Sequence, residues 1–295
     1  MKESSEGHVR GAGRFAPSPT GRMHMGNVCA ALASYVSAKS RGLDWVLRIE
    51  DLDPQRSREE YARMIEDDLM WLGLRWDRGG YDYEDSCGPY RQSLRGDYYA
   101  AALERLEATG LLYACTCTRA DIMATQAPHQ SDGRVIYSGR CRPTLPNRLG
   151  SFAGGRHSIR IAVDNEPVEV IDRRFGRRMY DLSREAGDFI LRRSDGAWAY
   201  QLAVVVDDAA MGITEVVRGE DLLLSAATQN YLYRLLELPV PEYEHIPLVT
   251  NAQGIRLSKR DASQSMEYLR AHFSPAEVLA RAAGLLGISL SGTIA

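Results

Sequence analysis

The sequence predicts an α/β protein with a parallel sheet, and three observations support this class. Segments with strand-like and helix-like patterns alternate in the order β-α-β-α through the first 72 residues, which favours parallel strands joined by helices. Further strands and helices follow residue 157, after a stretch without periodicity. The 295 residues, 44% hydrophobic and 25% charged, suit one large domain or a domain with an insertion.

The first half of the chain supplies the start of this sheet. An apolar run ends at a Pro- and Gly-rich turn, after which apolar residues recur at helical spacing. Ser57 and Glu60 fit a capping box at the start of a second helix, and Gly110 ends a third. These patterns predict strands at residues 9–16, 45–49 and 111–114, and helices from residue 28, over 57–72 and over 97–108.

The second half completes the sheet after an insertion. Residues 116–155 are rich in Gly, Pro, Arg and Ser and show no period, so something other than an apolar core must order them. After Lys259 only 36 residues remain, enough for about two helices. The patterns in this half predict strands at residues 157–163, 168–171, 189–192 and 213–217, and helices over 200–209 and 221–237.

Charge and cysteine content narrow the class of protein. With 36 Lys and Arg against 39 Asp and Glu, the net charge of −3 excludes a strongly basic nucleic-acid coat protein but not a local basic stripe. No run approaches the roughly 20 apolar residues of a membrane helix, and the first 14 residues lack the apolar core of a signal peptide. A cytoplasmic monomer without a membrane partner is expected. Three of the five cysteines fall within 27 residues, which points to a metal and not to a disulfide framework.

Two short motifs suggest a site for phosphates. The segment RFAPSPTGRMHMG, residues 14–26, lies between a predicted strand and a predicted helix, where backbone amides bind anions. His24 can donate to a phosphate there, although the prolines alone would form a turn that leaves His24 as a surface or packed residue. The segment IRLSKR, residues 255–260, follows a turn and places cations on a loop that could close over a triphosphate. By itself such a basic segment is usually a solvated surface.

Four sequence blocks in order carry a family resemblance. They are RFAPSPTGxxHxG from residue 14, LRIEDLD at 47–53, YQLAVVVDDAAMGITEVVRGEDLL at 200–223 and RLSK at 256–259. Over about residues 10–265 the chain resembles the class I glutamyl-tRNA synthetases and, more closely, their truncated paralogues, the glutamyl-queuosine tRNA(Asp) synthetases. The resemblance implies a class I synthetase Rossmann-type catalytic domain that uses ATP, with Mg²⁺ held mainly by phosphates and water, to activate L-glutamate as glutamyl adenylate.

The resemblance also implies the residues that act on ATP. His24 and Lys259 match the catalytic positions of the two motifs, which stabilise charge on the α-phosphate, and Gly26 and Asn27 complete the ATP-binding set with them. Asn27 stands where the family has a second His, and Arg256 stands for the first Lys of the loop. Because Asn donates a hydrogen bond without a charge, we expect slower chemistry and not its loss.

Glutamate presents two carboxylates and one ammonium, so its pocket should offer two cations and one anion. The family blocks imply Arg14 and Arg218 as the cations and Glu50 as the anion, with Ser18 and Tyr200 as neutral partners. Two simpler interpretations stay open at this stage. Glu50 could instead be a strand-end carboxylate paired with Arg48, and Arg218 could form a surface ion pair with Glu220 or Asp221. The adjacent Asp207 and Asp208 are interpreted as scaffold around the amino acid, and no catalytic acid is assigned.

Cys115, Cys117 and Cys141 supply three of the four ligands that a structural zinc site uses. Spacing alone nominates His129 as the fourth, while the resemblance implies Tyr137, four residues before Cys141. A phenol has a pKa near 10, so the Zn²⁺ would have to favour its ionised form. The alternative is three buried thiols without a metal.

The predicted domains are residues 10–114 and 185–260 for the two halves of the catalytic domain, 115–184 for the zinc-containing insertion and 261–295 for a short helical segment. A separate anticodon-binding domain does not fit after Lys259. The resemblance implies that the anticodon stem-loop of tRNA(Asp) enters the active site, where queuosine at the wobble position receives glutamate. Alternatives are conventional charging of tRNA(Glu) and a non-catalytic glutamate- or adenylate-binding module. Candidate phosphate contacts, which in part could equally form a solvated basic turn, are Arg134, Arg140, Arg142, Arg148, Arg173, Arg174, Arg177 and Arg178.

Overall fold

A seven-stranded sheet forms the centre of the molecule. The computed structural model describes residues 11–118, 120–121, 136–142, 156–249 and 262–289. Six of the sheet's strands run parallel and the last is antiparallel, which confirms the predicted fold class. In spatial order the strands are β3 (Arg78–Gly79), β2 (Asp44–Leu47), β1 (Ala12–Phe15), β9 (Ile213–Gly219), β10 (Glu242–Ile246), β6 (Val168–Asp172) and β7 (Gly176–Tyr180).

Helices cover both faces of this sheet, because its strands alternate their side chains between two cores. Trp45 and Leu47 pack into a core with helices α1 (Met25–Ser40), α2 (Glu59–Trp71), α8 (Met266–His272) and α9 (Pro275–Leu286). Val46, between them, packs into a second core with α3 (Gly96–Glu107), α6 (Tyr200–Ala210) and α7 (Leu223–Leu235). Sheet and helices therefore form three layers.

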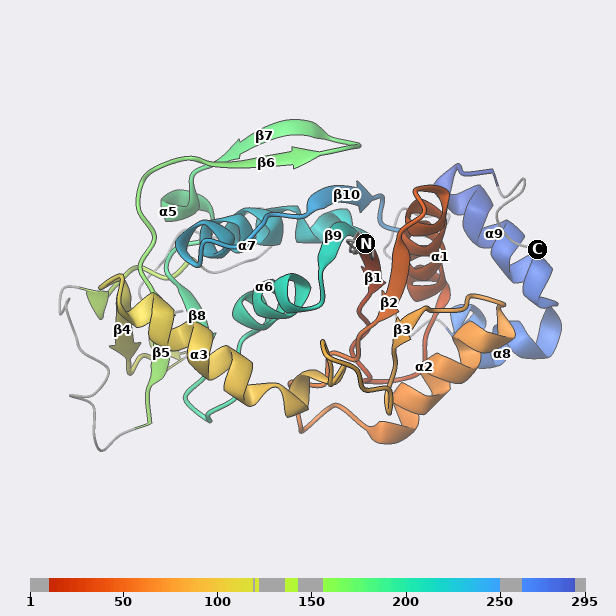
Figure 1. The fold of residues 1–295 in the computed structure, drawn as a ribbon, viewed down its shortest axis with the longest axis horizontal. Coiled ribbons are helices and arrows are strands. Elements are labelled where there is room, and N and C mark those ends of the chain that lie inside the picture. Colours follow the sequence, from red (N-terminus) through yellow and green to blue (C-terminus); the bar gives the residue numbers. More distant parts are fainter. Residues whose placement is uncertain (1–10, 119, 122–135, 143–155, 250–261, 290–295) are drawn as a thin grey trace, which may run out of the picture.

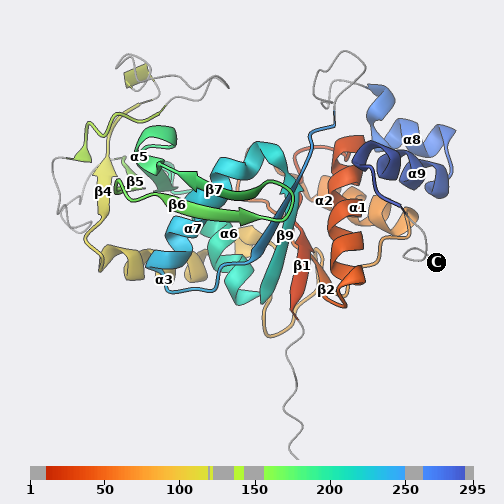
Figure 2. The ribbon, with the colours of Figure 1, turned by 90° about the horizontal axis from the view of Figure 1, so that it is seen from above.

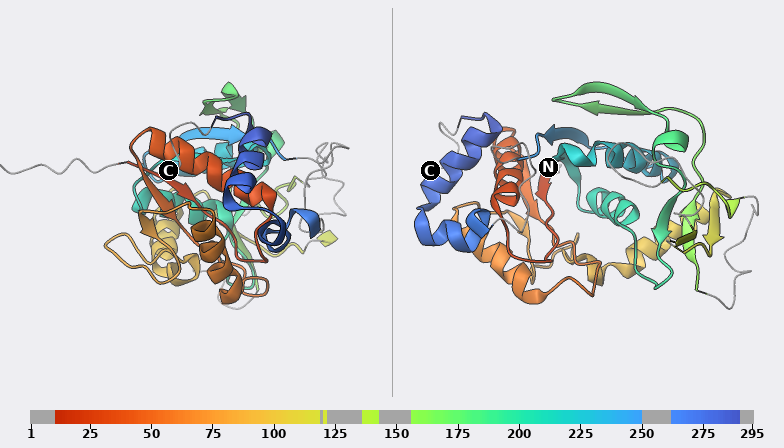
Figure 3. Two further views of the ribbon diagram at one scale, coloured as in Figure 1. Left: turned by 90° about the vertical axis from the view of Figure 1, so that its right-hand side faces the viewer. Right: turned by 180° about the vertical axis from the view of Figure 1, so that it is seen from behind.

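A smaller antiparallel sheet lies at one end of the molecule, next to the short helix α5 (Leu182–Glu185), and the C-terminal helices lie at the other end against α1 (Figures 1, 2 and 3). The strands of the smaller sheet are β4 (Leu112–Cys115), β5 (Ser158–Ile161) and β8 (Phe189–Arg192). The β6–β7 hairpin falls within the predicted insertion of residues 115–184 but is hydrogen-bonded to β10 of the main sheet. The domain boundaries thus remain a proposal.

Most predicted elements are present, with a few differences. Strands β3, β7 and β10 and the short helix α5 were not predicted, and the capping box at Ser57 is wrong: α2 begins after Arg58 and has no side-chain cap. The Ser57 amide instead bonds to the Asp53 carbonyl in the preceding turn, so the helix starts later. The two predicted C-terminal helices are confirmed, and α9 has a capping box from Ser274 and Glu277. Among the residues described, the helices are too short or too polar to span a lipid bilayer.

Candidate active site

A cavity of about 520 Å³ opens at the carboxyl ends of β1 and β9. The order β3-β2-β1-β9-β10 reverses direction between these two strands, and such a switch point is where open α/β sheets bind ligands. All eight described candidates for glutamate and ATP binding line this cavity: Arg14, Ser18, His24, Gly26, Asn27, Glu50, Tyr200 and Arg218. Lys259 and Arg256 lie outside the described residues.

The amino end of α1 forms one wall of the cavity. His24 is the N-cap, and its Nδ1 accepts a hydrogen bond from the Gly26 amide at 3.1 Å. Asn27 Oδ1 in turn accepts from the His24 amide at 3.1 Å, so these two residues form a capping box. A Cβ on Gly26 would lie 2.9 Å from Cε1 of His24, which explains the glycine. The positive end of the helix dipole makes this wall favourable for phosphate.

Arg14 enters the cavity from β1 and is held by a buried carboxylate. Its guanidinium lies 3.4 Å from Asp208 Oδ1, and Arg48 Nη1 lies 2.5 Å from the same oxygen. Arg48 also contacts Glu50 at 3.1 Å, so the simpler interpretation of Glu50 as a partner of Arg48 is correct while Glu50 still faces the cavity. Asp208 therefore connects an arginine of β1 with one that lies just after the neighbouring strand β2.

Charges within this network change the acidity of its carboxyls in opposite directions. Burial alone would raise the pKa of Asp208, but Arg48 and Arg14 outweigh burial and lower it. Burial raises the pKa of Glu50, and the same two arginines oppose that shift without cancelling it. Asp208 is thus the fixed negative charge of the site, whereas Glu50 gains most from a bound cation.

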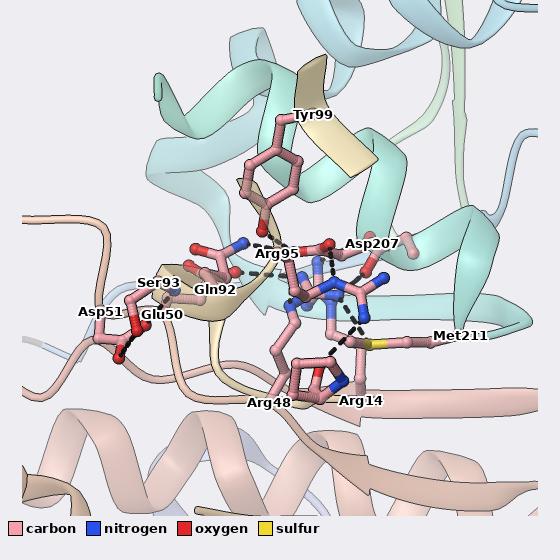
Figure 4. Close-up of polar contacts among 12 residues, drawn as sticks. Arg14, Arg48, Glu50, Asp51, Gln92, Ser93, Arg95, Tyr99, Asp207 and Met211 are labelled. Carbon is pink, nitrogen blue, oxygen red and sulfur yellow. Dashed lines mark hydrogen bonds and ion pairs between the residues drawn. The ribbon is translucent and has the colours of Figure 1, made fainter. Parts of the chain in front are cut away.

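A second carboxylate, Asp207, anchors the opposite side of the network (Figure 4). It accepts hydrogen bonds from Arg95 Nε at 2.5 Å, Gln92 Nε2 at 2.8 Å and the Tyr99 hydroxyl at 2.9 Å. Both aspartates project from α6 and are buried. This confirms their interpretation as scaffold around the site. The sequence feature that indicates such a scaffold is a pair of adjacent acids in an otherwise apolar helix, because buried carboxylates require cationic partners.

Arg218 approaches the cavity from β9 and is only 5% exposed. Its Nη1 donates to Gln229 Oε1 at 2.8 Å and to the Tyr200 hydroxyl at 3.4 Å, and its Nε donates to His245 Nε2 at 3.1 Å. The interpretation as a surface ion pair with Glu220 or Asp221 is therefore wrong. No sequence pattern pointed to His245, because a lone histidine in a short strand is usually a packed residue.

A second cavity of about 490 Å³ adjoins the first and was not predicted. The two cavities share Ser18, Thr20, Glu50 and Tyr200. Besides the shared Tyr200, a second aromatic side chain lines this cavity, Trp198. Tyr99 contacts this ring edge-on at 5.7 Å, and the Arg192 guanidinium lies over it at 5.0 Å. The remaining lining combines apolar residues such as Leu52 and Ile190 with polar and charged residues that include Asp53, Arg56, Gln92 and Arg193.

The three predicted cysteine ligands come together at the end of β4. The sulfur atoms of Cys115, Cys117 and Cys141 lie within 4.8 Å of one another and could hold a metal ion. The Tyr137 hydroxyl lies 3.3 Å from the Cys115 sulfur and 3.7 Å from that of Cys117. Burial would raise the pKa of Cys141, but hydrogen bonds from Tyr137 and the Thr116 backbone lower it to about 7. His129, the other predicted fourth ligand, lies outside the described residues.

The predicted basic residues differ in their surroundings. Arg173 is engaged in ion pairs, 2.6 Å from both Glu215 and Glu244. Arg174 and Arg178 are exposed on the β6–β7 hairpin, and Arg177 there pairs with Glu169. Arg142 pairs with Asp188 at 3.5 Å, while Arg140 is 63% exposed near Asp121. Arg134 and Arg148 lie outside the described residues.

Comparisons of this chain with known proteins lead to the same family. Residues 11–294 match the family model described as tRNA synthetases class I (E and Q), catalytic domain. A Glutamyl-Q tRNA(Asp) synthetase of Geobacter sulfurreducens is 47% identical over 86% of this chain and 77% of its own length. One of Leptothrix cholodnii is 44% identical over 94% and 90%, respectively.

Solved structures agree with this family. The glutamate-tRNA synthetase of Elizabethkingia anophelis superposes with a TM-score of 0.74 at 32% identity over 86% of this chain, which spans about half (53%) of that protein. A glutamate tRNA ligase of Elizabethkingia meningosepticum, solved with its amino acid, gives the same values. The chain belongs to the class I tRNA synthetases of the glutamate and glutamine group, matches their catalytic domain, and is thus an ATP-dependent ligase.

Proposed function

We propose that this chain activates L-glutamate with ATP to glutamyl adenylate and transfers the glutamyl group to queuosine at the wobble position of tRNA(Asp). The observation that carries the proposal is one cavity that brings Arg14, Arg218 and Glu50 next to the amino end of α1. Two guanidiniums and one carboxylate match the charges of a dicarboxylic amino acid. The relatives named Glutamyl-Q tRNA(Asp) synthetase support the choice of acceptor.

In the proposed activation step, a carboxylate oxygen of glutamate attacks the α-phosphorus of ATP and pyrophosphate leaves. Arg14 and Arg218 bind the carboxylates, and Glu50 binds the ammonium. His24, held by Gly26 and Asn27 at the amino end of α1, stabilises the charge that develops on the phosphate oxygens together with the helix dipole, and Lys259 is proposed to add its positive charge. Mg²⁺ accompanies ATP and offsets the charge of the triphosphate. This chain itself supplies positioning and electrostatic stabilisation.

The second cavity is the place we propose for the acceptor nucleoside. It connects with the glutamate pocket through Glu50 and Tyr200, so an acceptor hydroxyl can reach an activated carboxyl. Trp198 offers an aromatic face on which a base from a single-stranded loop can stack. Attack by this hydroxyl forms the ester and releases AMP. The exposed Arg174 and Arg178 of the hairpin are proposed to contact phosphates of the anticodon stem.

We further propose that the cysteine cluster holds a structural Zn²⁺ with Tyr137 as the fourth ligand. Tetrahedral zinc with sulfur at about 2.3 Å separates neighbouring sulfurs by roughly 3.8 Å. The sulfurs of Cys117 and Cys141 lie 3.6 Å apart, and the Tyr137 oxygen is 3.3 Å from the Cys115 sulfur. These residues therefore fit the ion. With four protein ligands the zinc would order the chain around the β4–β5 sheet and take no part in the reaction.

A two-part experiment tests the proposed function. Glutamate-dependent exchange of pyrophosphate into ATP should proceed with the metal-loaded protein in the absence of tRNA. Labelled glutamate should then be transferred to tRNA(Asp) that contains queuosine and not to tRNA(Asp) that lacks it. Labelling of unmodified tRNA(Glu) would instead assign conventional charging, and absence of exchange would assign a non-catalytic binding module.

A further inference from the structure

Behind Arg218 lies a chain of two further buried polar residues that the family motifs do not contain. Arg218 Nε is 3.1 Å from His245 Nε2, and His245 Nδ1 is 2.7 Å from Asp172 Oδ2. Arg218, His245 and Asp172 are 5%, 0% and 2% exposed, so solvent does not compete for these contacts. They come from three neighbouring strands, β9, β10 and β6.

The partners decide which nitrogen of His245 carries the proton. A guanidinium has only donors, so Nε2 must accept from Arg218 and carry no hydrogen. Asp172 is an acceptor that also receives the His245 backbone amide at 2.9 Å, so Nδ1 must donate to it. The imidazole is therefore neutral, and burial together with the Arg218 charge lowers the pKa of His245 to about 4.

This arrangement fixes the plane of the Arg218 guanidinium. Besides His245, it donates to Gln229, to Tyr200 and to the carbonyl of Leu222 at 3.4 Å. These four contacts can occupy four of the five N–H bonds of a guanidinium. A carboxylate in the cavity would thus meet a guanidinium that is already oriented, and binding would cost less ordering entropy.

We propose that His245 and Asp172 are positioning residues that orient Arg218 for a carboxylate of glutamate. The inference rests on the proposed function. Asp172 has a double role, because its Oδ1 accepts from the amides of Arg174 and Phe175 at 2.9 and 2.8 Å and so closes the turn of the β6–β7 hairpin. The same carboxylate joins that turn to the wall of the glutamate pocket.

Two substitutions of His245 separate the hydrogen bond from the packing. His245→Phe keeps a ring beside Tyr243, which the imidazole stacks on at 5.9 Å, but offers no acceptor to Arg218. His245→Gln offers an amide oxygen close to the position of Nε2. In pyrophosphate exchange, His245→Phe should raise KM for glutamate about tenfold with KM for ATP changed less than about twofold, and His245→Gln should stay within about threefold of wild type. His272→Gln, at an exposed residue of helix α8, is the matched control.

An NMR measurement keeps the proposal testable if His245→Phe does not fold. In ¹⁵N-histidine-labelled wild type, His245 should be protonated at Nδ1 and bare at Nε2. In Asp172→Asn the side-chain amide can donate to Nδ1 of His245, so the ring proton would move to Nε2. Nε2 could then no longer accept the hydrogen bond from Arg218, and KM for glutamate should rise. A wild-type His245 protonated at Nε2, or equal increases of both KM values in His245→Phe, would overturn the positioning role. Absence of pyrophosphate exchange in the wild type would instead refute the proposed function, and the NMR measurement would still determine the tautomer of His245.

Discussion

At the scale of single residues, Asp208 is the central charge of the site. It is 1% exposed and is the common acceptor for Arg14 and Arg48, which approach it from β1 and from just after β2. A buried carboxylate between two guanidiniums offsets much of the desolvation of all three groups. Its removal would leave two buried cations beside Glu50, so both stability and glutamate binding depend on it.

We therefore expect Asp208→Asn to lower the free energy of unfolding by about 3 kcal/mol and to raise KM for glutamate about tenfold or more. Urea unfolding and pyrophosphate exchange measure the two effects. Asp164→Asn is the control, because Asp164 pairs with Arg234 where both side chains are 45% exposed. It should change stability by less than about 1 kcal/mol. Equal destabilisation by the two variants would refute the role given to Asp208.

Gly26 is the second residue with a specific prediction. A methyl group there would meet the His24 ring at 2.9 Å and displace it from the helix cap. Gly26→Ala should lower kcat/KM for ATP about tenfold while KM for glutamate changes little. The control is Gly284→Ala in α9, where a Cβ would meet nothing within 4 Å and where alanine should stabilise the helix by up to about 1 kcal/mol. Unchanged ATP kinetics in Gly26→Ala would show that His24 does not act on the nucleotide.

At the scale of elements, local patterns predicted the long helices and most strands, whereas β7 and β10 were missed along with the two-residue β3. Strand β7 is exposed along most of its length and carries Arg177 and Arg178, so it lacks the apolar alternation that reveals a half-buried strand. Strand β10 is short and has glutamates at residues 242 and 244. The predicted capping box at Ser57 was wrong because the amide of Ser57 is bonded to the Asp53 carbonyl in the preceding turn.

The hairpin formed by β6 and β7 leads to a prediction about tRNA. Replacing Arg174 and Arg178 together by alanine should weaken binding of tRNA(Asp) and reduce the slope of log K against log salt by about 0.7 to 0.9 for each phosphate that the protein no longer neutralises. Pyrophosphate exchange should be unchanged, since neither side chain lines the glutamate cavity. Arg184→Ala, an 85% exposed side chain on α5, is the control. An unaltered salt slope would remove the hairpin from the proposed tRNA surface.

The cysteine cluster at the end of β4 gives a second prediction at this scale. The purified protein should contain about one zinc per chain, and Cys141→Ser should lower that content and the unfolding temperature. Cys87→Ser, whose thiol lies outside the cluster, should retain the metal. Elemental analysis and thermal unfolding measure both effects. A wild-type protein without metal, or a Cys141→Ser variant with full zinc content, would contradict the site.

At the scale of the whole molecule, His245 should link stability to pH. The groups that face it are Arg218 from β9 and Asp172 from β6, with the Tyr243 ring beside it. Its pKa falls from 6.5 to about 4 on folding, so between these values the unfolded chain binds more protons than the folded one. This contribution to stability is complete above pH 6.5 and disappears as pH falls toward 4.

Over that pH interval we expect the titration of His245 to lower the free energy of unfolding by roughly 3 kcal/mol. Denaturant unfolding at a series of pH values should show it as a steeper dependence in wild type than in His245→Gln, which cannot titrate. Asp172 affects stability only at lower pH. Burial would raise its pKa, but hydrogen bonds from His245 and the hairpin amides outweigh burial and lower it. Parallel pH profiles in the two proteins would show that His245 does not titrate as the fold implies.

The sequence by itself determined the chemistry of the site and most of its local structure. The family resemblance of the motifs identified Arg14, His24, Gly26 and Arg218, and the predicted strands and helices follow from spacing, caps and apolar periods, which act over a few residues. Only the tertiary structure decided what holds those residues in place. Arg14 meets Asp208 across 194 residues, and His245 meets Asp172 across 73. Such contacts depend on the order and register of parallel strands, which are set by packing across the whole sheet and leave no short-range signal in the chain.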